Sequence, residues 1–337
     1  MKRGRGFAYQ DASSKPVRDE STLERIRELA IPPAWKDVWI CADDRGHLQA
    51  VGTDAAGRRQ YLYHEQWRAR RDREKFERML DFAEVLPKVR RRVARDLRGD
   101  DASRDRVLAC AVRMLDVGFF RVGGETYAEE NDSFGLATLR KSHATISGNK
   151  VLFRYRAKSG KEQFHFITDP AAREVLDILK RRRGGGEELL SFREGRRWKD
   201  IQSGDINDYI KEVAGEEFSA KDFRTWNATV LAAHFLGVEA ARNGKRPSKT
   251  ARKRQMNAAV KWVAQLLGNT PAVCRSSYID PRVWDRFQSG WTIGGSVERI
   301  MEEPFLGRPR IREELEGAVV DLLEEPRQSP AVEKAAA

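Results

Sequence analysis

One tyrosine near the carboxyl end of the chain is displayed in a way that suits nucleophilic chemistry. Tyr278 lies in the run TPAVCRSSYIDPRVW, among short polar residues and just before a turn marked by proline. A phenol that attacks a phosphodiester needs fixed cations around the non-bridging oxygens and a proton donor for the departing oxygen. Three upstream segments offer such groups: GFFRVGGE with Arg121, YRAKSGKE with Lys158, and SAKDFRTWN with Arg224.

These four side chains also have ordinary structural interpretations. A single tyrosine is more often a half-buried packing residue, and arginines on a basic chain are usually solvated. The KSGK run that holds Lys158 and Lys161 is compatible with a plain β-turn. Guanidinium groups nevertheless match phosphate oxygens in geometry. The apolar residues before Arg121 and after Arg224 favour enclosed positions for both, so the residue types alone leave packing and phosphate chemistry open.

Six longer motifs occur in a fixed order from about residue 30 to about residue 285. They are IPPAWKDVWI, GHLQAVGTDAAGRRQYLYHEQW, FFRVGGETY, SFGLATLRKSH, KDFRTWNAT and SSYIDPRV. The ordered set resembles the type IB DNA topoisomerases, in particular their compact bacterial and poxvirus-like branch, whereas each motif alone is weak evidence. The resemblance implies an isomerase that relaxes supercoiled DNA by transient single-strand cleavage, strand rotation and religation, without ATP, metal or any other cofactor.

The resemblance also assigns roles to the basic and phenolic residues. Tyr278 is expected to attack the scissile phosphate and form a 3′-phosphotyrosyl intermediate. Arg121 and Arg224 are expected to hold charge on the pentacoordinate transition state, and Lys158 to donate a proton to the leaving 5′ oxygen. Lys161 is the rival to Lys158 for that donation.

One position departs from the family pattern. Asn269 lies nine residues before Tyr278, where most members have histidine. An asparagine side chain can still donate an N–H to a phosphate oxygen, but it cannot carry a positive charge. We therefore expect Asn269 to be catalytic with an altered rate, the alternative being that it only caps a helix in the TPAVCRSS segment.

A second group of residues is expected to contact DNA outside the reaction centre. By resemblance, the segment around residues 59–63 enters the major groove, and basic residues further along the chain touch the backbone. The alternative for the two tyrosines of that segment is that they share one packed face of a strand. The expected contacts are Arg59, Gln60, Tyr61, Tyr63, Arg140, Lys141 and Lys221.

Two other functions compete with the leading hypothesis. A tyrosine site-specific recombinase or integrase shares the Arg, Lys, Arg, Tyr set, but recombinases usually carry histidine three residues before the second arginine, where this chain has Lys221. They also lack the IPPAW and GHLQAVGTD segments. A catalytically idle DNA-binding protein of the same fold is disfavoured because, Asn269 apart, the nucleophile and phosphate-clamp positions keep their expected types.

Composition is compatible with a nucleic-acid partner. The 337 residues include 63 Lys and Arg against 51 Asp and Glu, a formal net charge of +12 that favours duplex DNA. Three scattered cysteines, not in metal-ligand spacing, indicate a reducing interior without a metal site. No transmembrane segment or secretory signal is apparent, so we expect a cytoplasmic, nucleoid-associated monomer that clamps around DNA.

Periodicity and turn signals predict an α+β fold. A helix capped by Ser21 or Thr22 and three short β-runs form a small N-terminal β-sheet domain, residues 1–82. Residues 83–325 form a larger, mainly α-helical, tyrosine-recombinase-like catalytic domain. Within it, the alternation and turns of ATISGNKVLFRYRAKSGKEQFHFITD predict a small three-stranded sheet with Lys158 at its last hairpin tip. Residues 326–337 are expected to be a disordered tail.

Overall fold

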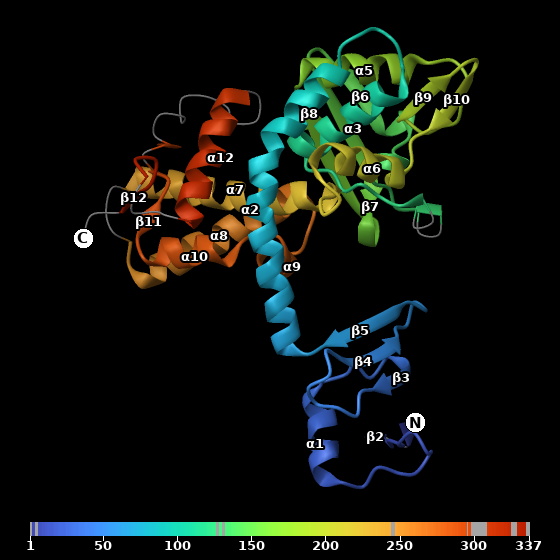
Figure 1. The fold of residues 1–337 in the computed structure, drawn as a ribbon, viewed down its shortest axis with the longest axis vertical. Coiled ribbons are helices and arrows are strands. Elements are labelled where there is room, and N and C mark those ends of the chain that lie inside the picture. Colours follow the sequence, from blue (N-terminus) through green and yellow to red (C-terminus); the bar gives the residue numbers. More distant parts are fainter. Residues whose placement is uncertain are drawn as a thin grey trace. The chain divides into compact units, whose positions relative to one another are not determined.

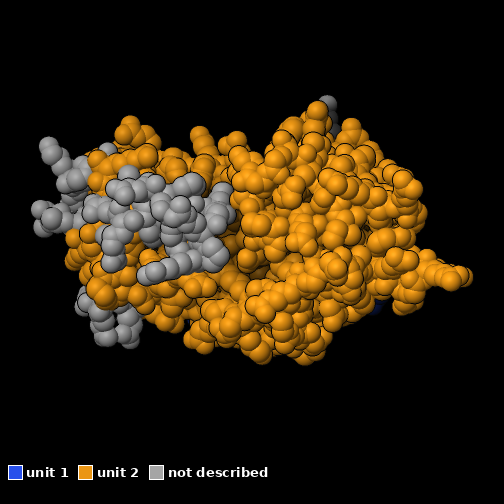
Figure 2. Space-filling model, turned by 90° about the horizontal axis from the view of Figure 1, so that it is seen from above, with its two compact units in different colours: residues 1–75 blue, residues 76–337 orange. Residues whose placement is uncertain are grey.

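The computed structural model describes residues 2–3, 6–125, 128–129, 132–243, 247–294, 296–297, 309–324 and 329–334. The fold mixes helices with small antiparallel sheets, which confirms the α+β class (Figure 1). The chain divides into two compact units, residues 1–75 and residues 76–337, coloured separately in Figure 2. In the described part of the chain, no helix combines the length and the apolar character needed to cross a lipid bilayer.

Unit 1 is built around a three-stranded antiparallel meander. Its elements are β1 (Lys2–Arg3), β2 (Gly6–Phe7), α1 (Glu20–Glu28), β3 (Lys36–Ile40), β4 (Leu48–Thr53) and β5 (Arg59–Tyr63), with the sheet order β3-β4-β5. The N-cap of α1 is Asp19, not Ser21 or Thr22 as expected. Its carboxylate accepts a hydrogen bond from the Thr22 backbone N–H at 2.8 Å and from both neighbouring hydroxyls. The helix therefore begins at Glu20, directly after this carboxylate.

Helix α2 (Glu65–Asp96) continues through Pro87, although a proline more often ends a helix. The buried stripe Phe76, Met79, Phe82, Leu86, Val89 and Val93 keeps helical spacing on both sides of it. Continuous packing of that stripe offsets the lost backbone hydrogen bond. The domain boundary expected at residues 82 and 83 lies inside this helix.

The rest of unit 2 is mainly helical (Figure 1). Its helices are α3 (Arg104–Gly118), α5 (Pro170–Arg181), α6 (Ser203–Ala214), α7 (Ala220–Asn243), α8 (Lys249–Leu267), α9 (Pro271–Ser277), α10 (Pro281–Gln288) and α12 (Pro309–Leu323), with the 3₁₀ turns η1 (Leu136–Thr138), η2 (Lys141–His143) and η3 (Lys158–Gly160). Its strands are β6 (Ala144–Ser147), β7 (Lys150–Ala157), β8 (Lys161–Ile167), β9 (Ser191–Glu194), β10 (Arg197–Asp200), β11 (Trp291–Thr292) and β12 (Glu333–Lys334).

The expected three-stranded sheet is present as β6-β7-β8. Strand β7 alternates strictly, with Val151, Phe153, Tyr155 and Ala157 buried and the residues between them exposed. Because side chains of a strand alternate between two faces, one face of the sheet packs on the core and the other faces outward. The β9-β10 hairpin, which turns at Gly195 with φ 59°, was not expected from the sequence.

Helix α3 is the centre of the core of unit 2. It is buried along most of its length and packs against α5, α6 and α7, while α7 also packs against α8, α10 and α12. Arg121 follows α3 and Arg224 lies within α7. The packing of these two helices therefore sets the separation of the two arginines.

The carboxyl-terminal segment differs from the expected disordered tail in its described part. Residues 333–334 pair with β11, and Val332 is buried. The Ala331 carbonyl accepts a hydrogen bond from the Ser296 hydroxyl at 3.0 Å. Residues 326–328 and 335–337 lie outside the described residues.

Candidate functional site

The loop that carries Arg121 is fixed by direct contact between two backbone segments. Phe119 ends α3 in the left-handed conformation, with φ 59°. Beyond it, the Arg121 carbonyl accepts from the Leu136 N–H at 2.8 Å. Gly123 has φ 88°, and a Cβ on Gly135 would lie 2.3 Å from the Gly123 Cα. Only glycine permits this approach, so these glycines hold the backbone of Arg121 in place.

Arg224 is held by helix ends and has no carboxylate partner in the described part of the chain. It is 4% exposed, and its guanidinium donates to the Phe119 carbonyl at 2.6 Å and the Leu267 carbonyl at 2.8 Å. Both carbonyls lie at helix C-termini, where carbonyls lack helical partners and carry partial negative charge. Burial lowers the pKa of Arg224 to about 10, with Tyr278 opposing the shift and Arg121 adding to it. The guanidinium therefore stays protonated at neutral pH.

Asn269 joins this group through Arg121. Gly268 ends α8 with φ 63°, and its carbonyl accepts from Arg121 Nη2 at 3.0 Å. The same nitrogen donates to Asn269 Oδ1. The Asn269 Nδ2 group is buried and has no hydrogen-bond partner among the described residues, and the same holds for Arg224 Nε. Two buried donors are thus left to bind an acceptor.

The alternative role for Asn269, that of a helix cap, is wrong. The N-cap of α9 is Thr270, whose hydroxyl accepts from the Val273 N–H at 3.3 Å. The Asn269 backbone N–H instead bonds to the Ala264 carbonyl at 2.9 Å, which ends α8.

Tyr278 lies at the C-terminal end of α9, against Arg224. Its ring centroid is 5.2 Å from Arg224 Cζ, within the range of a cation–π contact. The backbone N–H groups of Tyr278 and Ile279 both bond to the Cys274 carbonyl, at 3.1 and 3.2 Å. The tyrosine is half-buried and packs on the core. Tyr278 is therefore a half-buried packing residue, as the ordinary interpretation has it, and it also lies beside Arg224.

A small cavity of about 10 Å³, roughly the room of one water molecule, lies against Arg121 and Arg224. Sequence reasoning missed several of the residues around it. Burial, together with the positive charges of Arg224 and Arg121, lowers the pKa of His165 to about 4, so its imidazole is neutral at pH 7. Burial likewise raises the pKa of Tyr155. The signal that places both residues on the inner side is the alternation of β7 and β8. The cavity is lined by Phe119, Arg121, Phe134, Tyr155, Ala157, Gln163, His165, Arg224, Leu267 and Gly268.

Lys158 lies at the expected hairpin tip, in η3 between β7 and β8, and is exposed. The structure does not bring its side chain into a described contact with Tyr278 or the arginines. The residue before it, Ala157, lines the cavity. Gln163 of β8 covers Gly268 so closely that a Cβ there would lie 2.3 Å from the amide oxygen. The base of this hairpin therefore belongs to the site and its tip carries Lys158.

The expected DNA-contact residues of unit 1 lie on β5. Arg59 and Tyr61 are exposed, and Gln60 donates to Asp54 at 2.9 Å. The rings of Tyr61 and Tyr63 stack with centroids 6.3 Å apart. The two tyrosines thus share one face, as the packing alternative expected, and Tyr61 still keeps 49% of its surface exposed.

In unit 2, Arg140 and Lys221 are exposed and Lys141 is half-buried. The Arg140 guanidinium lies over the Phe134 ring at 5.0 Å, and Phe134 lines the small cavity. Lys221 lies in the first turn of α7, three residues before Arg224. Arg140 therefore packs on Phe134, one of the residues that line the small cavity.

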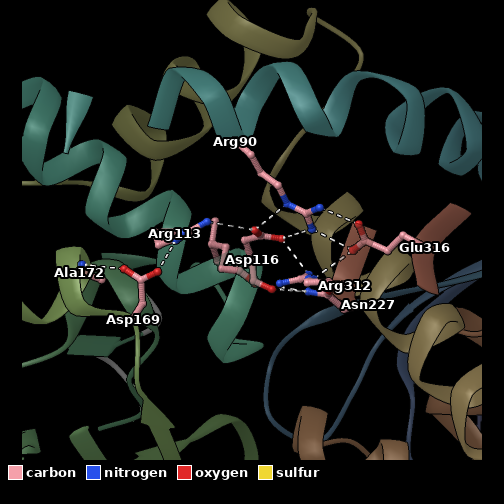
Figure 3. Close-up of polar contacts among 9 residues, drawn as sticks. Arg90, Arg113, Asp116, Asp169, Ala172, Asn227, Arg312 and Glu316 are labelled. Atoms are coloured by element: carbon pink, nitrogen blue, oxygen red, sulfur yellow. Dashed lines mark hydrogen bonds and ion pairs between the residues drawn. The ribbon is translucent and has the colours of Figure 1, made fainter. Parts of the chain in front are cut away.

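A buried ion-pair cluster lies at the C-terminal half of α3 (Figure 3). Asp116 accepts from Arg90 at 3.0 Å through both oxygens and pairs with Arg312 at 2.8 Å. Arg90 also binds Glu316 at 2.6 Å, and Asn227 donates to the Asp116 carbonyl at 3.1 Å. Burial raises the pKa of the Asp116 carboxyl, but the guanidiniums of Arg312 and Arg90 more than offset this and lower it to about 2. The cluster ties α2, α3, α7 and α12 together just before the Arg121 loop.

Comparison with known proteins shows the family of this chain. Residues 64–289 match the family model of the catalytic core of eukaryotic DNA topoisomerase I, and residues 6–54 match that of the N-terminal domain of bacterial DNA topoisomerase IB. The DNA topoisomerase 1B of Acanthamoeba polyphaga mimivirus is 33% identical over 290 residues, 82% of this chain and 83% of the relative. The DNA topoisomerase 1B of vaccinia virus (strain Copenhagen) is 26% identical over 277 residues, 78% of this chain and 82% of the relative.

The match of residues 64–289 to the catalytic core defines the class as DNA topoisomerases. The chain belongs to the type IB DNA topoisomerases, a family of isomerases. The sequence-based assignment of family is confirmed, and the recombinase alternative is not favoured.

Proposed function

We propose that this protein relaxes supercoiled duplex DNA by cleaving one strand, letting the duplex swivel and resealing the strand. The observation that carries the proposal is the group around Tyr278. The buried Arg224 guanidinium lies against the half-buried phenol, and the half-buried Arg121 guanidinium binds the carbonyl next to the one that Arg224 binds. Among the described residues, Asn269 Nδ2 and Arg224 Nε have no hydrogen-bond partner and neither arginine has a carboxylate partner. Cations of this kind near a nucleophile suit the charge of a pentacoordinate phosphate.

Each residue then has a proposed role. The Tyr278 phenol gives up its proton to water as its oxygen attacks the scissile phosphorus. The new bond is the 3′-phosphotyrosyl bond, the bond that breaks joins phosphorus to the 5′ oxygen of the next nucleotide, and this oxygen leaves with a proton from Lys158. Arg121, Arg224 and the Asn269 amide donate to the non-bridging oxygens. Religation is the reverse attack by the 5′ hydroxyl, so the bond energy is kept in the phosphotyrosyl link and neither ATP nor a metal ion is needed.

DNA contacts outside the reaction centre follow the division of the chain. Unit 1, residues 1–75, serves as the β-rich clamp domain, and unit 2 serves as the breaking and rejoining domain. The clamp uses the exposed face of β5, and unit 2 adds backbone contacts; the proposed contacts are Arg59, Gln60, Tyr61, Tyr63, Arg140, Lys141 and Lys221. The protein acts as a cytoplasmic, nucleoid-associated monomer.

The test is plasmid relaxation in EDTA without ATP, with covalent adducts trapped by denaturation. We expect relaxation by the wild type and, for Tyr278→Phe, neither relaxation nor adduct but nearly unchanged DNA binding. Tyr209→Phe is a matched control, because Tyr209 is buried and its hydroxyl bonds to Asp96. A covalent adduct in Tyr278→Phe would place the nucleophile elsewhere. Dependence on a paired target site would instead support a recombinase.

A further inference from the structure

Helix α7 contacts the nucleophile segment at a second point besides Arg224. Thr229 lies five residues further along α7 and is 0% exposed. Its hydroxyl oxygen accepts a hydrogen bond from the Asp280 backbone N–H at 3.1 Å. The same oxygen is 3.4 Å from the Tyr278 carbonyl and 3.0 Å from the Thr225 carbonyl. One buried hydroxyl thus meets the chain on both sides of Ile279.

The hydrogen-bond inventory of this hydroxyl limits what it can do. A threonine hydroxyl has one proton and two lone pairs. Three acceptors lie within reach of the proton: the Thr225 carbonyl at 3.0 Å, which is the nearest, and the Tyr278 carbonyl and Met79 Sδ, each at 3.4 Å. A lone pair receives the Asp280 N–H, and this bond links α7 to the nucleophile segment whichever acceptor takes the proton.

The segment after Tyr278 is otherwise held through α9 and α10. The N–H groups of Tyr278 and Ile279 bond to the Cys274 carbonyl, and the buried Asp280 carboxylate caps α10 by accepting from the Arg282 N–H at 2.8 Å. These bonds lie within the segment itself and fix its shape. Thr229 adds a bond from the helix that carries Arg224, so it fixes where this shape lies against the guanidinium.

We propose that Thr229 is a positioning residue for the reaction at Tyr278. The inference rests on the proposed function and goes beyond it by naming the group that sets the nucleophile against Arg224. A displacement of about 1 Å between reacting groups can cost about 100-fold in rate. Loss of the hydroxyl should therefore slow transesterification without touching DNA or the phosphate.

The experiment compares Thr229→Val with Thr229→Ser in single-turnover cleavage of a linear duplex. Valine keeps the shape and removes the hydroxyl, whereas serine keeps the hydroxyl. We expect Thr229→Val to lower the rate constants of cleavage and religation together, by about 10- to 100-fold, at unchanged final yield of adduct. Thr229→Ser should stay within about threefold of wild type, on the same argument that only displacement of the phenol costs rate.

Thr225→Val is the matched control. Thr225 is equally buried, one turn earlier on α7, and its hydroxyl bonds only to the Lys221 carbonyl of its own helix among the described residues, at 3.4 Å. A purely structural role for Thr229 would lower the active fraction, and so the final yield, at an unchanged rate constant. That result, or equal rates for Thr229→Val and Thr225→Val, would overturn the proposal.

Two further arms keep the outcome clear. If Thr229→Val does not fold, Thr229→Ala is compared with Thr229→Ser on material of equal thermal stability, and equal rate constants would refute the positioning role. Tyr278→Phe is run in parallel. Covalent adduct in that variant would mean that the proposed function has failed, whereas its absence together with normal rates in Thr229→Val would mean that only the positioning role has failed.

Discussion

Asn269 offers the sharpest test of the reaction centre, because its two amide atoms have different surroundings. Oδ1 accepts from Arg121, whereas Nδ2 is buried without a partner among the described residues. Asn269→Asp is nearly isosteric: it keeps the acceptor toward Arg121 and replaces the unpaired donor by a charged acceptor. Asn269→Ala removes both. The order of the two variants therefore shows which atom matters.

The magnitudes follow from the two contacts. A hydrogen bond to a charged group contributes about 1.5 to 3 kcal/mol, so Asn269→Ala should slow cleavage by roughly 10- to 150-fold. In Asn269→Asp, a carboxylate about 4 Å from a phosphate charge adds repulsion of about 4 kcal/mol at an effective dielectric constant of about 20. That repulsion corresponds to about a further 1,000-fold. Asn269→Asp should thus be much slower than Asn269→Ala.

The assay is single-turnover formation of the covalent adduct, with DNA affinity measured separately at the same salt concentration. If Asn269 acts only by holding Arg121, the carboxylate should hold it better, and Asn269→Asp should equal or exceed Asn269→Ala. That order would refute donation from Nδ2 to the phosphate. In Asn269→His, by contrast, the cleavage rate should equal or exceed that of the wild type. The gain should be largest below about pH 6.5, where an imidazole becomes positively charged.

Three other predictions concern separate parts of the molecule. Lys158→Ala should cleave a normal phosphodiester slowly and recover its rate on a substrate with a 5′-thio leaving group, because a thiolate departs without a proton. The control variant Lys161→Ala should cleave the two substrates at similar rates. If the sulfur substrate does not rescue Lys158→Ala, Lys158 is not the acid. Since the pKa of His165 falls to about 4 on folding, the unfolded chain binds the extra proton. The contribution of neutral His165 to the free energy of unfolding should therefore be fully present above about pH 6.5 and fall by up to about 3 kcal/mol toward pH 4. Urea titrations at several pH values measure this, and the same dependence of the unfolding free energy on pH in His165→Gln would disprove it. Asp116→Asn should lower the free energy of unfolding in urea by about 3 to 5 kcal/mol, because the arginines around it lose their carboxylate. Asp105 is exposed in the first turn of the same helix, so Asp105→Asn should lower it by under about 1 kcal/mol. Similar losses in the two variants would contradict a central role for the ion-pair cluster.

The three-stranded sheet of unit 2 could be predicted from sequence because its strands and turns each have a local signal. Strict alternation along residues 150–157 fixes β7, and the turn residues around Gly148 and Gly160 fix its hairpins. The glycines around Arg121 likewise mark a backbone that must turn tightly. What grouped Arg121, Arg224 and Tyr278 was the order of motifs, since no local pattern brings residues so far apart together.

Other features depend on contacts that a single sequence does not reveal. Pro87 normally signals a helix boundary, and only the buried stripe on both sides explains why α2 continues. The cap of α1 was placed on the wrong residue because Asp19, Ser21 and Thr22 are all good caps and their hydrogen bonds decide among them. The sequence gives no signal for Thr229, because a threonine in an apolar helix is indistinguishable from an ordinary packing residue. Its role depends on the hydrogen bond from the Asp280 backbone N–H, which only the structure shows.

The arginines of the reaction centre are held by carbonyl dipoles, and this has a consequence for how the protein balances stability against activity. A carboxylate partner would stabilise Arg224 in the folded state but would have to be displaced or repelled by every phosphate that enters. Carbonyl oxygens at helix ends fix the guanidinium without cancelling its charge, at the cost of desolvating a cation that lacks a full counter-charge. Burial of this cation is therefore locally destabilising within an otherwise well-packed core. In the proposed mechanism, the phosphate of the substrate supplies the missing negative charge. Selection for a more stable protein and selection for a faster enzyme would act on Arg224 in opposite directions.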